Sequence, residues 1–578
     1  MTGYAGNSPG HRGVAFWAAI IGLLLLSAGL VWYDLAAHEV LGRDENVTIV
    51  KLDQPDLKAV LEASNLKFTG QPSNTQPLYF LLQYLAWPLV GRSTFMLRFL
   101  AAVFGVLTVA LTYKLGEALF DHKVGLAGAL LTALLPLHVQ YSQIVRPYTL
   151  LSALSLASAY FLVRALKTNR SVHWIGFVLT AGLNFYNHYN ALFVLAAEGL
   201  FAAVVWCVTL AGVVKKRQPP GRLIGPVLGF LMVGILCAPG LIRLFGFPWV
   251  GLSGQREAGG SIIVELTLPF FRSFLYRIGV REAWLQGLLV GLMVLGLVAS
   301  LYRRRWQAAL LTVLWISLPF AILSVIKSPR PFAERYLIFV PPVALLLVGE
   351  GIVFGAEALG ILADRQGKRH LRWTLTIVFS LALALLLAGS LPAYYSANRA
   401  EGRLEQTIVV LERQARPGDV VIVSPRTFVR PLAVDGADVL YLHKHLTPAE
   451  LEDLASHYQR MWILYTSYIP PAELQEPLDQ WLLAQPDRFV RVPIKAVNML
   501  AFGILSATDV EAALKDQIVV LEDLAHSPAG EYETWARHNL LADAYQALSD
   551  HYASQGESAL AAEYGEKAQE ARTAVSPP

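Results

Sequence analysis

The sequence predicts an α-helical polytopic membrane protein with about eleven transmembrane helices, followed by an α/β domain and a helical tail. Of its 578 residues, 55% are hydrophobic and 16% are charged, and the mean hydropathy is +0.46. Soluble domains carry about a quarter charged residues, so this balance indicates a membrane protein. The composition becomes soluble after residue 398. We therefore predict a transmembrane domain over 1–398, an α/β domain over 399–508 and a helical tail over 509–578.

The predicted spans are apolar runs with few charges, and a helix needs about twenty such residues to cross a bilayer. The first run follows His11 and Arg12, as a signal peptide would, but the later runs favour a retained membrane anchor. The full-length runs are 14–33, 124–145, 223–242, 283–302, 306–326 and 373–398, and the shorter ones are 99–113, 147–163, 171–197, 199–214 and 336–355.

Basic loops set the predicted orientation, because Lys and Arg accumulate on the cytoplasmic side of membrane proteins. The segment 78–90 is short and contains Pro88, so we expect it to lie on the outer membrane surface and not to span the membrane. Most basic loops then fall on one side, and Arg92 and Arg98 are the exceptions. We therefore expect a multi-pass protein of the cell (plasma or inner) membrane, with a cytoplasmic N-terminus. The loop over 34–95 and the C-terminal domain are then extracytoplasmic.

The C-terminal part alternates between strand and helix patterns. "RPGDVVIVSP", "ADVLYLH" and "MWILYTSY" predict strands, and "TPAELEDLASHYQ" predicts a helix that begins with a threonine cap. From about 509 to 573 the pattern is wholly helical. It is typical either of one tetratricopeptide-like helical pair, which could bind a protein partner, or of a helical cap on the α/β domain.

Several function classes are disfavoured by composition. The net charge is only +4, and no basic stretch is interleaved with aromatic residues, so we expect no nucleic-acid partner. Cys207 and Cys237 lie inside apolar runs, which leaves neither a disulfide framework nor a CxxC metal site. The sequence has no GxxxxGK[ST] loop, which argues against a cytoplasmic nucleotide sugar as donor.

Two acidic residues follow the first apolar run. Asp44 and Glu45 lie in the external loop, ahead of amphipathic and aromatic-rich segments that would hold the loop on the membrane surface. A carboxylate held there could accept a proton from an incoming hydroxyl. The alternative is a solvated flank of a membrane helix.

A second candidate site is "YSQIVRPY", between two apolar runs on the external side. Arg146 is surrounded by the hydrogen-bonding side chains of Tyr141, Gln143 and Tyr148. Arginine binds phosphate through paired, charge-assisted hydrogen bonds, so this group is a candidate for phosphate binding. An interfacial anchor is the alternative.

Two further polar groups fall on the same side. His188 and Tyr189 lie in "NFYNHYN", where polar residues indicate either a cavity or a turn between spans. Lys327, Arg330 and Arg335 form a cationic group that suits an anion such as a lipid phosphate, or ordinary headgroups.

The order of these motifs resembles membrane glycosyltransferases of the GT-C class (glycosyltransferase family 39-like), such as protein O-mannosyltransferases and aminoarabinose transferases. The resemblance covers roughly residues 14–510. Two motifs of this chain match family motifs with changes: "QPLYF" corresponds to the family's "PPLYY", and "YSQIVRPY" corresponds to its "YSQEARMY". The other matching features are the acidic pair, "RFLAAVFGVLTVALTYKLGEALF", "NHYN", "RYL" and "RPGDVVIVSP".

The resemblance implies transfer of a sugar from a polyprenyl phosphate to an acceptor hydroxyl. Asp44 would be the catalytic base, supported by Glu45, and Arg146 and Arg335 would stabilise the leaving phosphate. A single base favours direct displacement with inversion. With no metal cluster evident, we expect neither a metal nor another cofactor. The acceptor would be a glycan, lipid or protein.

The sequence departs from the family pattern at two places. Thr75-Gln76 stands where the family has a histidine before the "PPLYY" helix, and Ile144 stands where the family has an acid. Gln76 and Tyr79 are candidate substrate contacts. A different substrate or an inactive scaffold would account for both changes. A lipid-linked glycan transporter is a further alternative, although no internal repeat of the kind common in transporters is visible.

Overall fold

In the computed structural model the chain forms two compact units. The first comprises Met1–Leu35 and Lys51–Tyr395, and the second comprises Ala36–Val50 and Ser396–Pro578. The described residues are 13–33, 35, 45, 48, 51–52, 56–65, 76–90, 94–215, 219–246, 264–325, 333–363, 369–395, 411, 413–423, 438–441, 448–458, 460–466, 481, 489–495, 498–504, 510–526 and 531–575.

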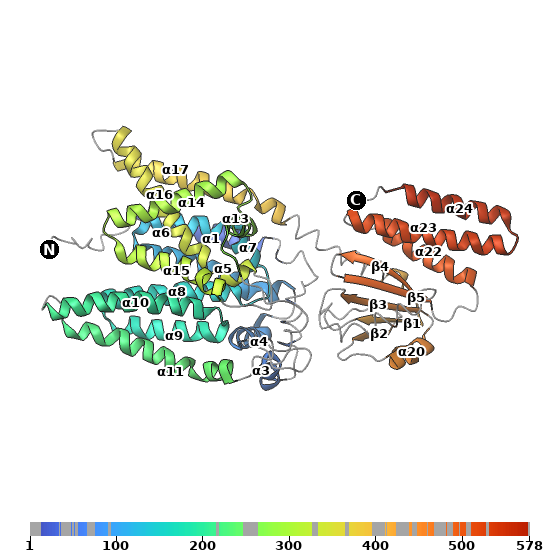
Figure 1. The fold of residues 1–578 in the computed structure, drawn as a ribbon, viewed down its shortest axis with the longest axis horizontal. Coiled ribbons are helices and arrows are strands. Elements are labelled where there is room, and N and C mark those ends of the chain that lie inside the picture. Colours follow the sequence, from blue (N-terminus) through green and yellow to red (C-terminus); the bar gives the residue numbers. More distant parts are fainter. Residues whose placement is uncertain are drawn as a thin grey trace. The chain divides into compact units, whose positions relative to one another are not determined.

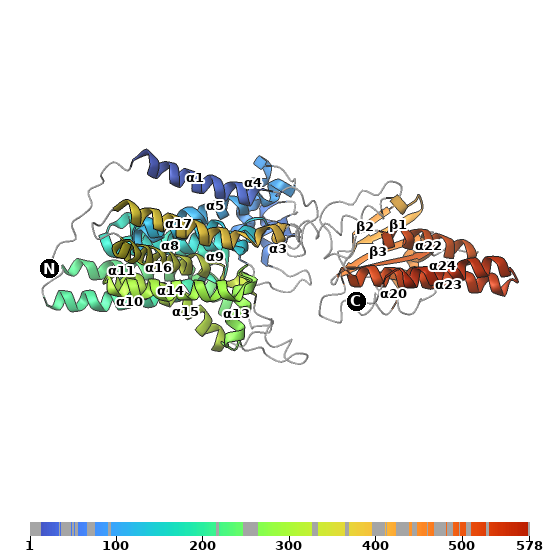
Figure 2. The same cartoon turned by 90° about the horizontal axis from the view of Figure 1, so that it is seen from above.

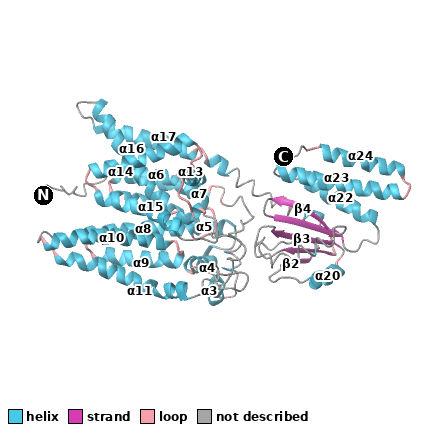
Figure 3. Cartoon of the chain, in the orientation of Figure 1, coloured by secondary structure: helices cyan, strands magenta, loops and turns pink. Residues whose placement is uncertain are grey.

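The described part of the first unit is helical (Figures 1 and 3). Helix α5 packs against α6 and α8, α8 packs against α9, and α14 packs against α16. Helix α1 runs alongside α5 (Figure 2). The elements are α1 (Val14–Trp32), α3 (Leu57–Asn65), α4 (Leu78–Val90), α5 (Thr94–Leu119), α6 (His122–Ala133), α7 (Pro136–Ser142), α8 (Tyr148–Thr168), α9 (Ser171–Asn187), α10 (Ala191–Val214), η1 (Pro220–Leu223), α11 (Ile224–Gly246), α13 (Leu268–Arg277), α14 (Ala283–Tyr302), α15 (Trp306–Val325), η2 (Glu334–Leu337), α16 (Val340–Ala363) and α17 (Arg369–Ala388).

These helices confirm a polytopic helical membrane protein. Among the described residues, eight helices are long and apolar enough to cross a membrane, or nine if a bent pair counts as one span. The shorter helix Phe16–Trp32 is also apolar. The count of about eleven spans and the surface position of α4 remain predictions, although α4 has the bounds that the sequence suggested.

Two segments differ from the sequence-based expectation. The run 124–145, expected as one span, is broken into α6 and α7, which meet at 64°. Pro136 begins α7, because proline has no N–H and suits the first turn of a new helix. Helix α13, whose N-terminus is capped by Thr267, lies between the predicted spans 223–242 and 283–302, where no helix was predicted.

Close helix packing in the first unit depends on small residues. A side-chain carbon added at Gly296 of α14 would lie 1.9 Å from the backbone oxygen of Leu347, and one at Gly351 of α16 would lie 2.1 Å from that of Leu292. Both distances are far below van der Waals contact. Small residues therefore allow α14 and α16 to approach closely, as they commonly do in membrane bundles.

The second unit contains a five-stranded mixed sheet (Figure 3) with the order β2-β1-β3-β5-β4. The pairs β1–β2 and β1–β3 are parallel, and β3–β5 and β4–β5 are antiparallel. The first three strands match the predicted ones, whereas the hairpin β4–β5 was not predicted. The elements are β1 (Asp419–Val423), β2 (Asp438–Tyr441), α20 (Pro448–His457), β3 (Arg460–Thr466), β4 (Phe489–Lys495) and β5 (Asn498–Ile504).

Three helices complete the second unit: α22 (Val510–His526), α23 (Glu531–Ser554) and α24 (Ser558–Thr573). Leu521 and Leu524 of α22 share one buried cluster with Val421 of β1 and Trp462 of β3. The helical tail and the sheet therefore have a common core, as expected for a helical cap. The tetratricopeptide-like character of the α23–α24 pair remains a prediction.

Candidate functional site

Arg146 lies in the turn between α7 and α8. The backbone N–H of Arg146 donates to the Ile144 carbonyl at 2.7 Å. Pro147 follows at the N-cap position of α8, with φ −71°. Asn187, at the end of α9, donates from Nδ2 to the Pro147 carbonyl at 3.1 Å and so ties the turn to a second helix. The predicted polar turn is thus held in place from both sides.

Aromatic rings connect Arg146 with other predicted site residues. The Arg146 guanidinium lies 5.7 Å from the centre of the Tyr148 ring. The Tyr148 ring lies 5.8 Å from the His188 ring and 5.2 Å from the Tyr141 ring. The structure therefore brings together Arg146, Tyr141, Tyr148 and His188, which come from two separate stretches of sequence.

Lys51 is a member of this cluster that sequence reasoning missed. It is 6% exposed, its Nζ lies 5.7 Å from the centre of the Phe80 ring, and it donates to the Ser64 carbonyl at 3.4 Å. Burial, and after it the positive charge of Arg146, lowers the pKa of Lys51 to about 8. Two cations held near one another form an electropositive region suited to an anion.

His188 is neutral near pH 7 in this environment. Burial, and after it Arg146, lowers the pKa of His188 to about 4. Its Nδ1 accepts from the backbone N–H of Asn190 at 3.1 Å, so the proton of the neutral ring is on Nε2. His188 thus presents Nε2–H as a hydrogen-bond donor.

The short helix η2 brings Arg335 to the same region. Tyr141 donates from its hydroxyl to Glu334 Oε1 at 3.2 Å, and Glu334 Oε2 lies 3.6 Å from Arg277 Nη1. Arg335 interacts electrostatically with Tyr141 and lies 5.5 Å from the centre of the Tyr336 ring. Glu334 was not predicted as a site residue; its only sequence signal is that it precedes Arg335.

Other predicted residues have different surroundings. Gln143 donates from Nε2 to the carbonyls of Val31 (3.2 Å) and Tyr33 (2.7 Å) and accepts from the Tyr394 hydroxyl at 2.9 Å. The Gln143 side chain therefore ties the end of α1 to the segment after α17. Ile144, which replaces the family's acid, packs against the hydrophobic core.

Four further predicted residues are buried or packed against aromatic rings or other polar side chains. In the first unit, Gln76 is 5% exposed, Tyr79 is buried and accepts from Gln83 Nε2 at 2.9 Å, and Tyr189 contacts the Phe185 ring with centres 5.8 Å apart. Glu45 is buried. Asp44, Lys327 and Arg330 lie outside the described residues.

Within the described residues, no group of three or more His, Cys, Asp or Glu side chains could hold a metal ion. Because Asp44 is outside that set, the expectation of a metal-independent protein remains a prediction.

Comparison with known proteins supports the fold. Residues 71–236 match the family described as dolichyl-phosphate-mannose-protein mannosyltransferase. No curated protein matches the sequence. The chain is similar to the crystal structure of ArnT from Cupriavidus metallidurans in the apo state, with 12% identity and a TM-score of 0.54 over 85% of this chain and 99% of that one.

A second structure of ArnT from the same organism, bound to undecaprenyl phosphate, matches with 13% identity and a TM-score of 0.52 over 86% of this chain and 99% of that one. A crystal structure of the Archaeoglobus fulgidus oligosaccharyltransferase in the apo form matches with 13% identity and a TM-score of 0.44 over 79% of this chain and 70% of that one.

These matches confirm the predicted resemblance to GT-C polytopic membrane glycosyltransferases. At such low identity the structural likeness establishes the fold. The family match covers the segment that contains Gln76, Tyr79, Arg146 and His188.

Proposed function

We propose that the protein is an integral-membrane glycosyltransferase that moves a sugar from a polyprenyl-phosphate donor to an acceptor hydroxyl on the extracytoplasmic face. The observation that carries this proposal is the group of Arg146, Lys51 and neighbouring aromatic rings, which lies where helices of a GT-C fold end. The binding of undecaprenyl phosphate by ArnT, a structure of the same fold, supports a lipid-phosphate donor.

The donor phosphate would occupy the electropositive region. A sugar leaving a polyprenyl phosphate departs with an acidic phosphate, so positive charge suffices to stabilise the leaving group. Arg146 supplies paired donors and Lys51 a compact ammonium group. Arg335 joins them beside Tyr141, while Lys327 and Arg330 remain predicted contributors.

Neutral and aromatic groups would bind the sugar and its linkage. His188 offers Nε2–H, a donor that stays available across physiological pH because burial keeps its pKa near 4. Tyr148 lies between His188 and Arg146 and provides a flat apolar surface. Gln76 and Tyr79 are the further candidates for substrate contact.

Asp44 is proposed as the base that takes the proton from the acceptor hydroxyl, with Glu45 supporting it. The hydroxyl oxygen would form the new bond to the anomeric carbon while the bond from that carbon to the phosphate oxygen breaks. A single displacement of this kind inverts the anomeric centre. The proposal includes no metal or other cofactor.

The proposed setting is the cell (plasma or inner) membrane, with the N-terminus cytoplasmic and the C-terminal unit extracytoplasmic. The acceptor is a glycan, lipid or protein. The helical tail is a candidate surface for a protein partner, and no nucleic-acid partner is expected.

The test uses the purified full chain in lipid, with a radiolabelled polyprenyl-phosphate sugar and a mixture of acceptors. Label should move to an acceptor, with release of polyprenyl phosphate. Asp44→Asn should lose transfer by about 100-fold or more while retaining donor binding. The matched control is Asp56→Asn, which changes an exposed carboxylate in the same loop that accepts from the Ala59 backbone N–H at 2.8 Å.

Two results would overturn the proposal. Movement of the intact lipid-linked sugar across the membrane without transfer would indicate a transporter. Donor binding without either reaction, in wild type and Asp44→Asn alike, would indicate an inactive scaffold.

A further inference from the structure

A cavity lies at the ends of α8 and α9 opposite the candidate site. α8 begins at Tyr148, beside Arg146, and its last turn reaches Leu166 and Asn169 on the other side of the bundle. There a cavity of about 250 Å³ opens between the ends of α8, α9, α10, α11 and α15. The family resemblance and the proposed transferase site give this cavity no role.

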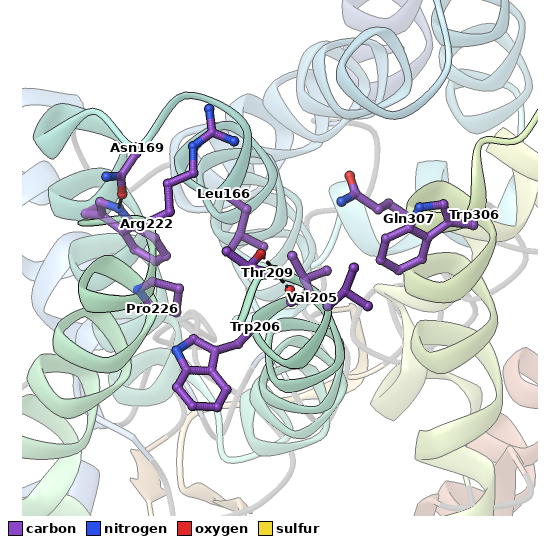
Figure 4. A pocket seen from close by; sticks show the side chains of 11 residues that line it. Leu166, Asn169, Val205, Trp206, Thr209, Arg222, Pro226, Trp306 and Gln307 are labelled. Carbon is purple, nitrogen blue, oxygen red and sulfur yellow. Dashed lines mark hydrogen bonds between the residues drawn. The ribbon is translucent and has the colours of Figure 1, made fainter. Parts of the chain in front are cut away.

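The cavity combines tryptophans with a few polar groups. Figure 4 shows Asn169 and Arg222 on one side, Trp306 and Gln307 on the other, and Leu166, Val205 and Thr209 between them. Trp174 and Trp206 complete the aromatic part of the lining. Tryptophans at one level of a helical bundle are typical of the boundary between lipid chains and headgroups.

The wall around Arg222 is held by hydrogen bonds and close packing. Trp174 Nε1 donates to Asn169 Oδ1 at 3.2 Å, and Asn169 Nδ2 donates to the Gly221 carbonyl at 3.4 Å. A side-chain carbon added at Gly225 would lie 2.5 Å from Trp174 Nε1. The segment that carries Arg222 is therefore packed tightly against the turn between α8 and α9.

The same segment is anchored to α10 as well. Trp206 Nε1 donates to the Leu223 carbonyl at 3.1 Å. The polar edges of two cavity tryptophans are thus used within the protein, and both help to position η1, the element that contains Arg222.

Arg222 makes the cavity electropositive. Of the described residues that line it, Arg222 is the only one with a formal charge, and it forms no ion pair within the described part of the chain. An arginine held at a membrane boundary suits a phosphate, which accepts paired N–H donors from the guanidinium.

The helices that form the cavity also carry exposed apolar side chains. Ile175 of α9 is 58% exposed, Val208 of α10 is 50% exposed and Leu228 of α11 is 50% exposed. In a membrane protein such side chains face lipid. A ligand with its phosphate at Arg222 can therefore lay apolar chains along these helices, a combination that free phosphate lacks.

We propose that this cavity binds the phosphate headgroup of an anionic phospholipid from the leaflet opposite the candidate transferase site. Arg222 binds the phosphate, Asn169 and Gln307 provide polar contacts, and Trp206 and Trp306 flank the glycerol region. The inference is independent of the proposed transferase activity.

The experiment is native mass spectrometry of the full chain, purified in detergent, stripped of lipid and titrated with phosphatidylglycerol or phosphatidylcholine. Wild type should bind phosphatidylglycerol more tightly. Arg222→Gln should weaken that binding by about tenfold, and Arg222→Lys should restore part of it. Arg170→Gln is the matched control, because Arg170 is an exposed arginine at the start of α9 and does not line the cavity.

Two further arms separate this cavity from other phosphate sites. In an Arg146→Gln background, phosphatidylglycerol should still bind in a manner that depends on Arg222. Equal affinity for both lipids, an unchanged affinity in Arg222→Gln, or equal protection from thermal unfolding by inorganic phosphate alone would overturn the proposal.

Discussion

Two groups of arginines in the transmembrane unit have different neighbours. At the end opposite the candidate site, Arg303 and Arg305, in the turn between α14 and α15, contact carboxylates. Glu350 of α16, which is 0% exposed, lies 2.9 Å from Arg303 Nη1 and 3.2 Å from Arg305 Nη1. Arg303 also contacts Glu357 at 2.6 Å, and Arg305 contacts Asp121 at 3.1 Å.

At the candidate site, Arg146 lies beside another cation, Lys51, and aromatic rings. Balanced charges hold helices together without attracting a further ion, whereas adjacent like charges cost stability that a bound anion recovers. The neighbours of an arginine therefore distinguish a structural role from a binding role.

The largest expected effect is on stability, at the balanced end. Glu350→Ala leaves Arg303 and Arg305 without their shared buried carboxylate, and breaking a buried ion pair costs about 3–5 kcal/mol. The thermal unfolding temperature in detergent should fall sharply. Activity per folded molecule should stay near wild type, and a selective loss of activity at unchanged Tm would contradict the structural role.

Arg146→Gln should lower activity and leave stability almost unchanged, the opposite of Glu350→Ala. Removing a group that stabilises developing charge typically lowers catalysis by about 100- to 1000-fold. The effect should appear in kcat/KM with the polyprenyl-phosphate donor, while Tm stays close to wild type. An active Arg146→Gln enzyme with a lowered Tm would place Arg146 with the structural arginines.

The pH dependence of Lys51 sharpens the comparison further. Because burial and Arg146 lower its folded-state pKa from 10.5 to about 8, a protonated Lys51 costs folding stability below about pH 8. That cost is relieved as pH rises from about 8 toward 10.5. The affinity for the donor should change in the opposite direction and fall as pH rises, because the phosphate binds the ammonium form of Lys51.

We therefore expect KM for the donor to rise by up to about tenfold per pH unit above about pH 8. Over the same pH range, the loss of the Lys51 charge should raise the free energy of unfolding. Initial rates measured from pH 6.5 to 9.5 test this. Lys51→Met should flatten the dependence, and a profile identical to wild type would remove Lys51 from the donor site.

The smallest effect should come from an exposed pair. Lys58 and Glu62 are 3.9 Å apart, with side chains 86% and 64% exposed. Lys58→Gln should change stability by less than about 0.5 kcal/mol and leave transfer unchanged. A large loss of activity would show that charge anywhere in this loop matters, and would weaken the contrast between the two ends.

Part of the site was predictable because its residues interrupt long apolar stretches. Arg146, His188 and Arg335 each stand at an expected span boundary, where a polar residue is conspicuous. Lys51 and Glu334 had no such contrast, since each lies in a segment with other charges. Gln143 was as conspicuous as Arg146, yet its amide holds α1 and the segment after α17.

The sequence by itself determined the membrane class, most of the helices, the first three strands and the helical tail, because hydropathy and periodicity are local properties. Only the tertiary structure decided how prolines act: Pro239 and Pro319 lie inside helices, whereas Pro136 begins a new helix at a 64° bend. It also decided that Lys51 lies near Arg146. The physical reason is that the local sequence permits several backbone conformations almost equally, and packing between distant segments selects one of them. The same long-range packing brings together charges that are far apart in the sequence.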